Sequence, residues 1–168
     1  AGLKYLFPLF AFALGVLIAE QIQHKYKYAK RLHWRQGILG AEIIILFIVG
    51  FIPQRGNMIA TVLVSFACAM QVQSFRKVNG FSYASTMCIG NLRSGTAALS
   101  FYLRERRPEQ LRQAMYYLGI IVLFAIGAGI GGNLSANYGI HMIWVSCGLL
   151  IVSFLLMFLD IEARRSRA

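Results

Sequence analysis

Long apolar runs alternate with short polar segments along the whole sequence. Each run approaches the roughly 20 residues that an α-helix needs to cross the hydrocarbon of a bilayer. Linkers at 53–57 and 133–139 contain Pro, Asn or Gly, and their lengths favour antiparallel helical hairpins. We therefore predict an all-α fold, a polytopic transmembrane helix bundle that forms a single domain over residues 1–168. The runs cover residues 5–22, 37–52, 58–75, 81–103, 114–132 and 140–159.

Basic residues gather between these runs. If 81–103 crossed the membrane fully, the cluster at 104–112 would lie opposite the first two clusters, and the charge asymmetry would disappear. If this run enters and returns, all four clusters share one side, and only Lys4 and Arg55 lie on the other. We therefore predict about five full spans and one broken or re-entrant helix over 81–103; the alternative is an ordinary buried helix with Gly at close crossings. The clusters are Lys25, Lys27, Lys30, Arg31 and Arg35; Arg76 and Lys77; Arg104, Arg106, Arg107 and Arg112; and Arg164, Arg165 and Arg167.

A short pattern recurs near the two ends of the chain. The segment Tyr-Leu followed by Phe-Ala-Leu-Gly at 5–15 returns as Tyr-Leu followed by Phe-Ala-Ile-Gly at 117–127. Each copy is followed by a linker and a second apolar run. In the re-entrant arrangement the two copies run in opposite directions, which indicates an inverted repeat of the kind that many secondary transporters use. The alternative is a chance similarity of two apolar helices that contain Gly.

Composition narrows the class of protein further. The chain is 58% hydrophobic, has six acidic residues and carries a net charge of +11. We attribute this charge to cytoplasmic loops that lie near anionic lipid headgroups, and we expect no nucleic-acid partner. The three Cys and three His residues lack metal-binding spacing, so we expect no metal and no cofactor. Nucleotide-binding and hydrolase motifs are missing from the sequence, and we do not expect an enzyme.

Residues 68–95 carry a more specific pattern, and this stretch resembles a segment of the YoaK family of bacterial multi-pass membrane proteins, which is described as a domain of unknown function. Family members show Met-Gln before a basic pair and a Gly, then Thr-Gly-Asn followed by Leu and often Arg. Ile89 stands at the position of the Thr. The resemblance implies an earlier motif ahead of the first helix, so we expect the chain to be the C-terminal three quarters of a longer protein. The matching residues are Met70, Gln71, Arg76, Lys77, Gly80, Gly90, Asn91, Leu92 and Arg93.

Several polar residues within the apolar runs are candidates for function. Arg93 is costly inside an apolar segment unless it faces a partner or a wet cavity, and its alternative is snorkelling to the surface. Gln71 and Gln73 diverge on a helix, and we expect Gln71 to be the interior one. Glu42 is a candidate proton carrier; alternatively, its carboxyl is protonated or paired with an Arg. The predicted solute-binding residues are Gln71, Gly90, Asn91, Arg93 and Thr96.

We therefore predict a multi-pass protein of the bacterial plasma (inner) membrane, with its basic loops and C-terminus in the cytoplasm. Our first hypothesis is a transporter of a small solute, with an anion as one option. The second is a non-transporting interaction or scaffold protein that binds a partner and anionic lipid. Its binding surface would be the Gly residues at 127, 129, 131 and 132, which place small residues four apart and also suit a homo-oligomer.

Overall fold

The computed structural model describes residues 2–26, 34–78, 81–82 and 88–165. The chain divides into two compact units, one of Ala1–Ser74 with Tyr138–Ala168 and one of Phe75–Asn137. Six α-helices account for almost all of the described residues, which confirms the predicted all-α class and the predicted number of helices. Parts of two basic clusters (27–33 and 167), together with Gly80, lie outside the described residues.

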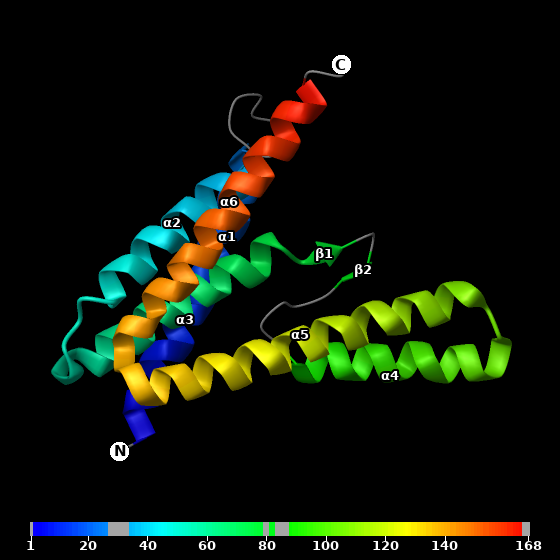
Figure 1. Cartoon of the computed structure of the whole chain (residues 1–168), viewed down its shortest axis with the longest axis horizontal. Helices are drawn as coiled ribbons and strands as arrows, with labels where there is room; N and C mark the ends of the chain where they lie inside the picture. Colours follow the sequence, from blue (N-terminus) through cyan, green and yellow to red (C-terminus); the bar gives the residue numbers. More distant parts are fainter. Residues whose placement is uncertain (1, 27–33, 79–80, 83–87, 166–168) are drawn as a thin grey trace. The chain divides into compact units, whose positions relative to one another are not determined.

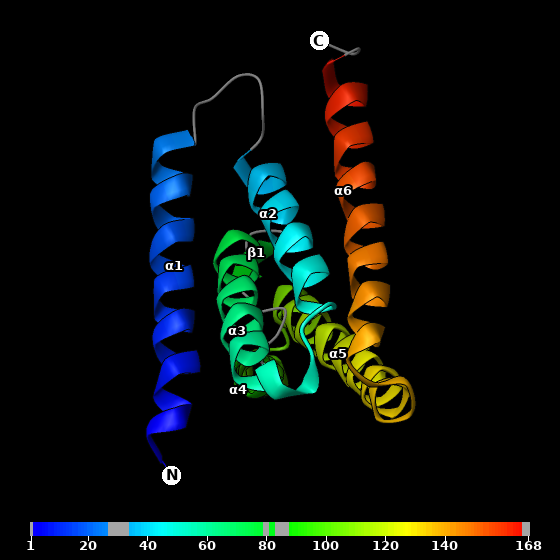
Figure 2. The ribbon, with the colours of Figure 1, turned by 90° about the vertical axis from the view of Figure 1, so that its left-hand side faces the viewer.

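The first unit contains four α-helices (Figure 1). Short 3-10 helices precede three of them: η1 (Gly2–Tyr5) before α1, η2 (Gln54–Gly56) before α3, and η3 (Gly139–Met142) before α6. Figure 2 shows α2 between α3 and α6, in agreement with the contacts that α2 makes with both helices. The helices are α1 (Leu6–Tyr26), α2 (Trp34–Val49), α3 (Asn57–Ser74) and α6 (Ile143–Arg165).

The core of this unit consists of two small clusters. Ala19, Ile38 and Met70 bring α1, α2 and α3 together, and Leu46, Ala67 and Cys147 bring α2, α3 and α6 together. Most other large apolar side chains are exposed. This is the pattern expected of helices whose outer faces contact lipid, because lipid tails solvate apolar side chains as well as a protein core does.

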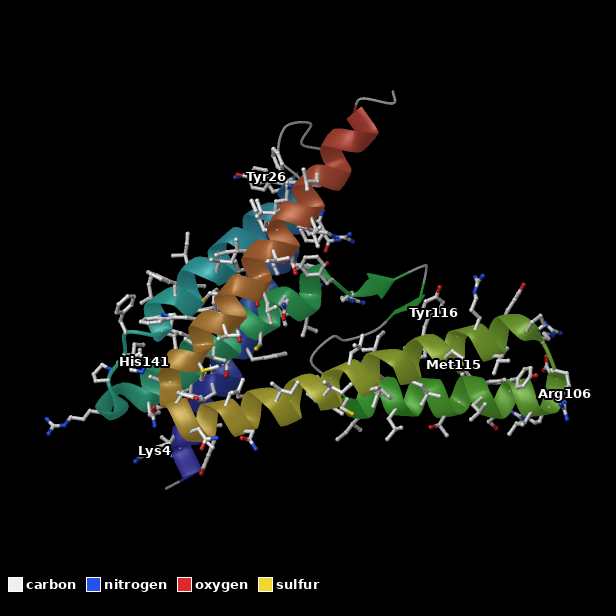
Figure 3. All side chains as sticks on the ribbon, viewed as in Figure 1. Lys4, Tyr26, Arg106, Met115, Tyr116 and His141 are labelled. Atoms are coloured by element: carbon white, nitrogen blue, oxygen red, sulfur yellow. The ribbon has the colours of Figure 1, made fainter. Side chains whose placement is uncertain are left out.

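The second unit contains a helical hairpin and a very short strand pair. The strands β1 (Lys77–Val78) and β2 (Phe81–Ser82) are antiparallel, with Lys77 opposite Ser82 and Val78 opposite Phe81. Helices α4 (Cys88–Glu105) and α5 (Pro108–Tyr138) follow and lie side by side (Figure 1). Arg106 lies at the turn between them (Figure 3) and has a positive φ of 56°.

Two predicted boundaries differ from the structure. The run 81–103 begins in a strand and is one continuous helix from Cys88 onward, so α4 itself is not broken. The predicted linker 133–139 is wrong for most of its length, because α5 continues through Asn133 and Asn137 to Tyr138. The Asn137 amide donates hydrogen bonds to the backbone and side-chain oxygens of Asn133, one helical turn earlier. Only Gly139, with φ of 68°, breaks the helical geometry there.

Among the described residues, three stretches have the length and apolar composition to cross a membrane: Leu3–Tyr26, Asn57–Ser74 and Pro108–Leu159. The last stretch has 52 residues and contains all of α5 and most of α6. Lys4 of η1, just before α1, and Tyr26, the last residue of α1, flank this apolar helix at its two ends (Figure 3). Helix α2, with 16 residues, is shorter than a typical span.

Candidate functional site

Glu42 lies on the buried face of α2. Residues four apart on a helix share a face, and Glu42 falls between Ile38 and Leu46 on such a row. Ile38 is 1% exposed, Leu46 8% and Glu42 itself 3%. The Oε2 atom of Glu42 is buried and has no hydrogen-bond partner within the described part of the chain. The apolar face of α2 thus carries a carboxyl group of which one oxygen accepts no hydrogen bond from the described residues.

This carboxyl group lines a cleft of about 380 Å³ inside the first unit. Helices α2, α3 and α6 form its walls, and these are the three helices that the second core cluster holds together. The volume lies in the range of pockets that hold small molecules. Its polar lining comes from Glu42, Cys68, Gln71, Ser146 and Ser153, and its apolar lining from Leu46, Val64, Ile143, Leu149 and Leu150.

Two polar groups at or next to the cleft already have hydrogen-bond partners. The Ser153 hydroxyl donates to the Leu149 carbonyl at 3.0 Å, one turn earlier in α6. The Cys147 thiol, next to the cleft, points to the Ile43 carbonyl of α2 at 3.9 Å. The Glu42 carboxyl is the strongest acceptor that the lining offers, because hydrogen bonds to an ionised acceptor are stronger than those to a neutral one.

Gln71 and Gln73 diverge as predicted, but their burial differs from the prediction. Gln73 is the more buried residue, at 9% exposure, and its amide donates a hydrogen bond to the Glu20 carboxylate of α1. Gln71 is half-buried and faces the cleft beside Glu42. The expectation that Gln71 is more buried than Gln73 is therefore wrong. Gln71 is nevertheless the one of the two that lines the cleft. Gln73 instead joins α1 to α3.

The other predicted residues lie on α4, in the second unit, and they divide between two faces of that helix. Gly90, Arg93 and Thr96 follow one another at intervals of three and are all exposed. Asn91 is 3% exposed and lies on the same face as Gly95, where a Cβ atom would approach the Tyr117 Cβ of α5 to 3.0 Å. The helix thus presents Arg93 and Thr96 together and turns Asn91 toward a packed face.

Ser146, Ser153 and Cys68 were missed as lining residues by the sequence reasoning. Each is a small residue in an apolar helix, where packing is the ordinary explanation. Only the three-helix arrangement shows that they surround Glu42. Within the residues that the structure describes, no group of three or more His, Cys, Asp or Glu side chains could hold a metal ion.

A family model described as a protein of unknown function (DUF1275) matches residues 1–156 of this chain. The YoaK family is a DUF1275 family, so the resemblance drawn from residues 68–95 is confirmed. Neither a curated protein nor a solved structure matches the chain. The matched range includes the second unit, all of the first unit except residues 157–168, and all five polar or thiol-bearing residues of the cleft.

Proposed function

This chain belongs to the DUF1275 family, whose function is unknown, and we propose that it is a membrane transporter of a small solute. The observation that supports this role is the buried Glu42 carboxyl, which lines a cleft between apolar helices and whose Oε2 atom has no hydrogen-bond partner among the described residues. An ionisable residue within membrane helices is expensive to keep, and it ordinarily marks a pathway for an ion or a solute. We propose binding and passage of the solute without a covalent step.

Glu42 is also the proposed proton carrier. A carboxyl that lines a cleft can take up a proton when the cleft faces water on one side and release it on the other. Gln71 offers a donor and an acceptor beside it, because an amide side chain carries both. The pair provides hydrogen-bonding groups that can orient a solute between apolar walls.

The residues of α4 provide a second set of proposed solute contacts. Gly90, Arg93 and Thr96 are exposed along one row, and Asn91 lies on the neighbouring buried face. An anionic solute would use Arg93, because a guanidinium binds carboxylate or phosphate groups through paired hydrogen bonds. The cleft around Glu42 has the opposite charge. Replacing Arg93 by Ala therefore distinguishes an anionic solute bound by Arg93 from a solute bound at the Glu42 cleft. If the solute is anionic, the Arg93→Ala protein should no longer be stabilised by adding it.

We propose that the protein lies in the bacterial plasma membrane with its basic loops and C-terminus in the cytoplasm. Within the first unit, the start of α1 and the η2 turn lie at one end, and the end of α1 and the end of α6 lie at the other (Figure 2). Lys4 and Arg55 therefore lie at the end of this unit opposite His24 and Lys25, which supports the proposed orientation. Whether 81–103 crosses or re-enters the membrane stays a prediction.

Cysteine labelling from both sides of a membrane tests the transporter. Cys68 lines the cleft, so it reports access to the cleft when Cys88 and Cys147 are replaced by Ala. The protein is reconstituted in liposomes, and a membrane-impermeant thiosulfonate is added outside or trapped inside. Alternating access predicts that Cys68 reacts from both sides. Reaction from neither side would contradict transport through this cleft.

One observation favours the second candidate, a non-transporting interaction protein. On α5, a Cβ atom added at Gly127, Gly129, Gly131 or Gly132 would meet nothing within 4 Å among the described residues. Small residues four apart allow another helix to approach closely, so this face suits a partner or a second copy. Gly129→Leu should abolish a complex formed through this face. Light scattering coupled to size-exclusion chromatography measures the change, with Gly119→Leu on the same helix as the control.

A further inference from the structure

The charges around the cleft point to one class of solute. Ten residues line it, and the carboxyl of Glu42 is the only group among them that carries a full charge when ionised. No Lys, Arg or His is among these ten residues. A cavity lined in this way favours a hydrogen-bond donor that is positively charged and repels an anion, because opposite charges attract strongly where water is scarce.

Two thiols are the titratable neighbours of Glu42. Cys68 of α3 lines the cleft, and Cys147 of α6 lies behind the lining; both are near enough to feel the charge of Glu42. Neither supplies a positive charge. Of the three helices that form the cleft, α3 and α6 therefore bring no cation to neutralise the carboxylate at the lining. A bound cation is the simplest group that does.

The remaining lining distinguishes an organic cation from a metal ion. Magnesium and calcium bind six or more oxygen ligands, and the cleft offers one carboxylate, one amide and two hydroxyls. The other walls are apolar, from Leu46, Leu149 and Leu150 among others. An ammonium group needs only a few acceptors, and an attached hydrocarbon portion fills apolar walls favourably.

We propose that this cleft binds a small amphiphilic ammonium ion, with its charged nitrogen on the Glu42 carboxylate and its apolar part against Leu46, Leu149 and Leu150. This inference rests on the proposed transport function and names its substrate class. Binding exchanges one positive charge for another: protonated Glu42 releases its proton to water, and the carboxylate then pairs with the ammonium. Departure of the ammonium on the other side allows Glu42 to take up a proton again.

Three probes of the same size and different charge test this class. Benzylammonium, benzyl alcohol and benzoate are each added to the whole chain in lipid nanodiscs, with Cys68 as the single thiol. The rate of Cys68 alkylation by N-ethylmaleimide is measured with and without each probe. Benzylammonium should slow alkylation at concentrations about tenfold lower than benzyl alcohol, because it adds a charge-assisted hydrogen bond. Benzoate should give no protection. Protection by benzylammonium should weaken as the pH is lowered and Glu42 takes up a proton.

Glu42→Gln keeps the shape of the side chain and removes its charge, and it should erase the tenfold preference for benzylammonium. Glu20→Gln is the matched control, because Glu20 lies on α1 outside the cleft lining and should leave the preference unchanged. Equal protection by benzyl alcohol and benzylammonium in the wild-type chain would overturn the inference without any variant at Glu42. If Cys68 reacts but none of the probes slows its alkylation, the ammonium substrate class is overturned while the proposed transport function is not. If Cys68 never reacts, both the substrate class and transport through this cleft are overturned.

Discussion

Glycines in the two units have opposite surroundings. Gly15 of α1 lies where a Cβ atom would be 2.6 Å from the Phe66 carbonyl oxygen and 2.8 Å from the Ala69 Cβ of α3. Gly129 of α5 belongs to the second unit and has nothing within 4 Å of its Cβ position among the described residues. Both are helical glycines in apolar sequence. One permits a tight helix contact inside the chain, and the other leaves a helix face open.

The difference shows that a run of small residues does not reveal where helices meet. The glycines at 127–132 gave the stronger sequence pattern, with small residues four apart, whereas Gly15 belongs to no such run. The close approach of α3 at Gly15 requires a glycine, because the opposing backbone oxygen of Phe66 cannot rotate away. The predictions below compare such packed positions with matched open ones.

The largest effect is expected from Gly15→Ala. The added methyl group would force α1 away from α3, and overpacking of this kind costs about 1–3 kcal/mol. Gly129→Ala is the matched change at an open site, and there the higher helix propensity of Ala should stabilise by up to about 1 kcal/mol. Thermal unfolding in detergent, followed by fluorescence-detected size-exclusion chromatography, measures both. Equal effects of the two changes would contradict the assigned α1–α3 contact.

Gly50→Ala should have a smaller effect, because the atom it meets belongs to a side chain. An added Cβ would overlap the indole nitrogen of Trp144, whose ring packs against Phe51 with centroids 5.2 Å apart. We expect Trp144 to rotate away at a cost of about 1 kcal/mol, since an aromatic pair is worth about that much.

The readout for Gly50→Ala is tryptophan emission, with Trp34→Phe as the background so that Trp144 alone reports. Gly148→Ala is the control, because nothing lies within 4 Å of its Cβ position. The emission maximum should shift for Gly50→Ala and stay constant for Gly148→Ala. An unchanged spectrum in both would show that Trp144 does not pack at Gly50.

The Gln73–Glu20 hydrogen bond should contribute about 0.6 kcal/mol, the average for polar contacts between membrane helices. A double-mutant cycle with Gln73→Leu and Glu20→Leu isolates this coupling. The two single changes should together cost more than the double change. Strict additivity would mean that the amide and the carboxylate do not interact across α1 and α3.

The smallest effect on stability is expected at Arg106, in the turn between α4 and α5. Arg106 has φ of 56°, a left-handed conformation that glycine adopts without steric cost. Arg106→Gly should stabilise by about 0.5 kcal/mol, because relief of strain slightly exceeds the entropy that glycine adds to the unfolded chain. Arg107→Gly is the control and should destabilise slightly, since its exposed ion pair with Glu105 contributes little. Chemical denaturation compares the two.

The lengths of the apolar runs predicted the all-α class and the number of helices, but they did not predict where the helices end. The segment 133–139 looked like a linker because Asn usually favours turns. Asn133 and Asn137 instead lie one helical turn apart, and their side chains satisfy each other within the helix. Pro108 and Glu109 begin α5 in the middle of a basic cluster, where Pro suits the first helical turn and an acid suits the helix dipole.

The sequence predicted some residues of the candidate site and not others. Glu42 and Gln71 stand out because polar residues in apolar runs are costly, and the structure places both at one cleft. Ser146 and Ser153 come from a helix more than 70 residues away in sequence, and neither has a local signal that separates it from packing residues. Arg93 and Asn91 share a motif in sequence but lie on different faces of α4, because they are two positions apart on a helix.

The measurement that tests the central claim most directly is the charge preference of Cys68 beside Glu42. A chain with Cys68 as its single thiol is treated with two methanethiosulfonates of similar size, one cationic and one anionic. At a pH high enough to ionise Glu42 in the empty cleft, we expect the cationic reagent to react about tenfold faster, after correction for its rate with a free thiol, because the carboxylate concentrates cations. Glu42→Gln should remove this preference. Equal rates in the wild-type chain, or a preference that survives Glu42→Gln, would contradict the assignment of Glu42 as the charge that selects the solute.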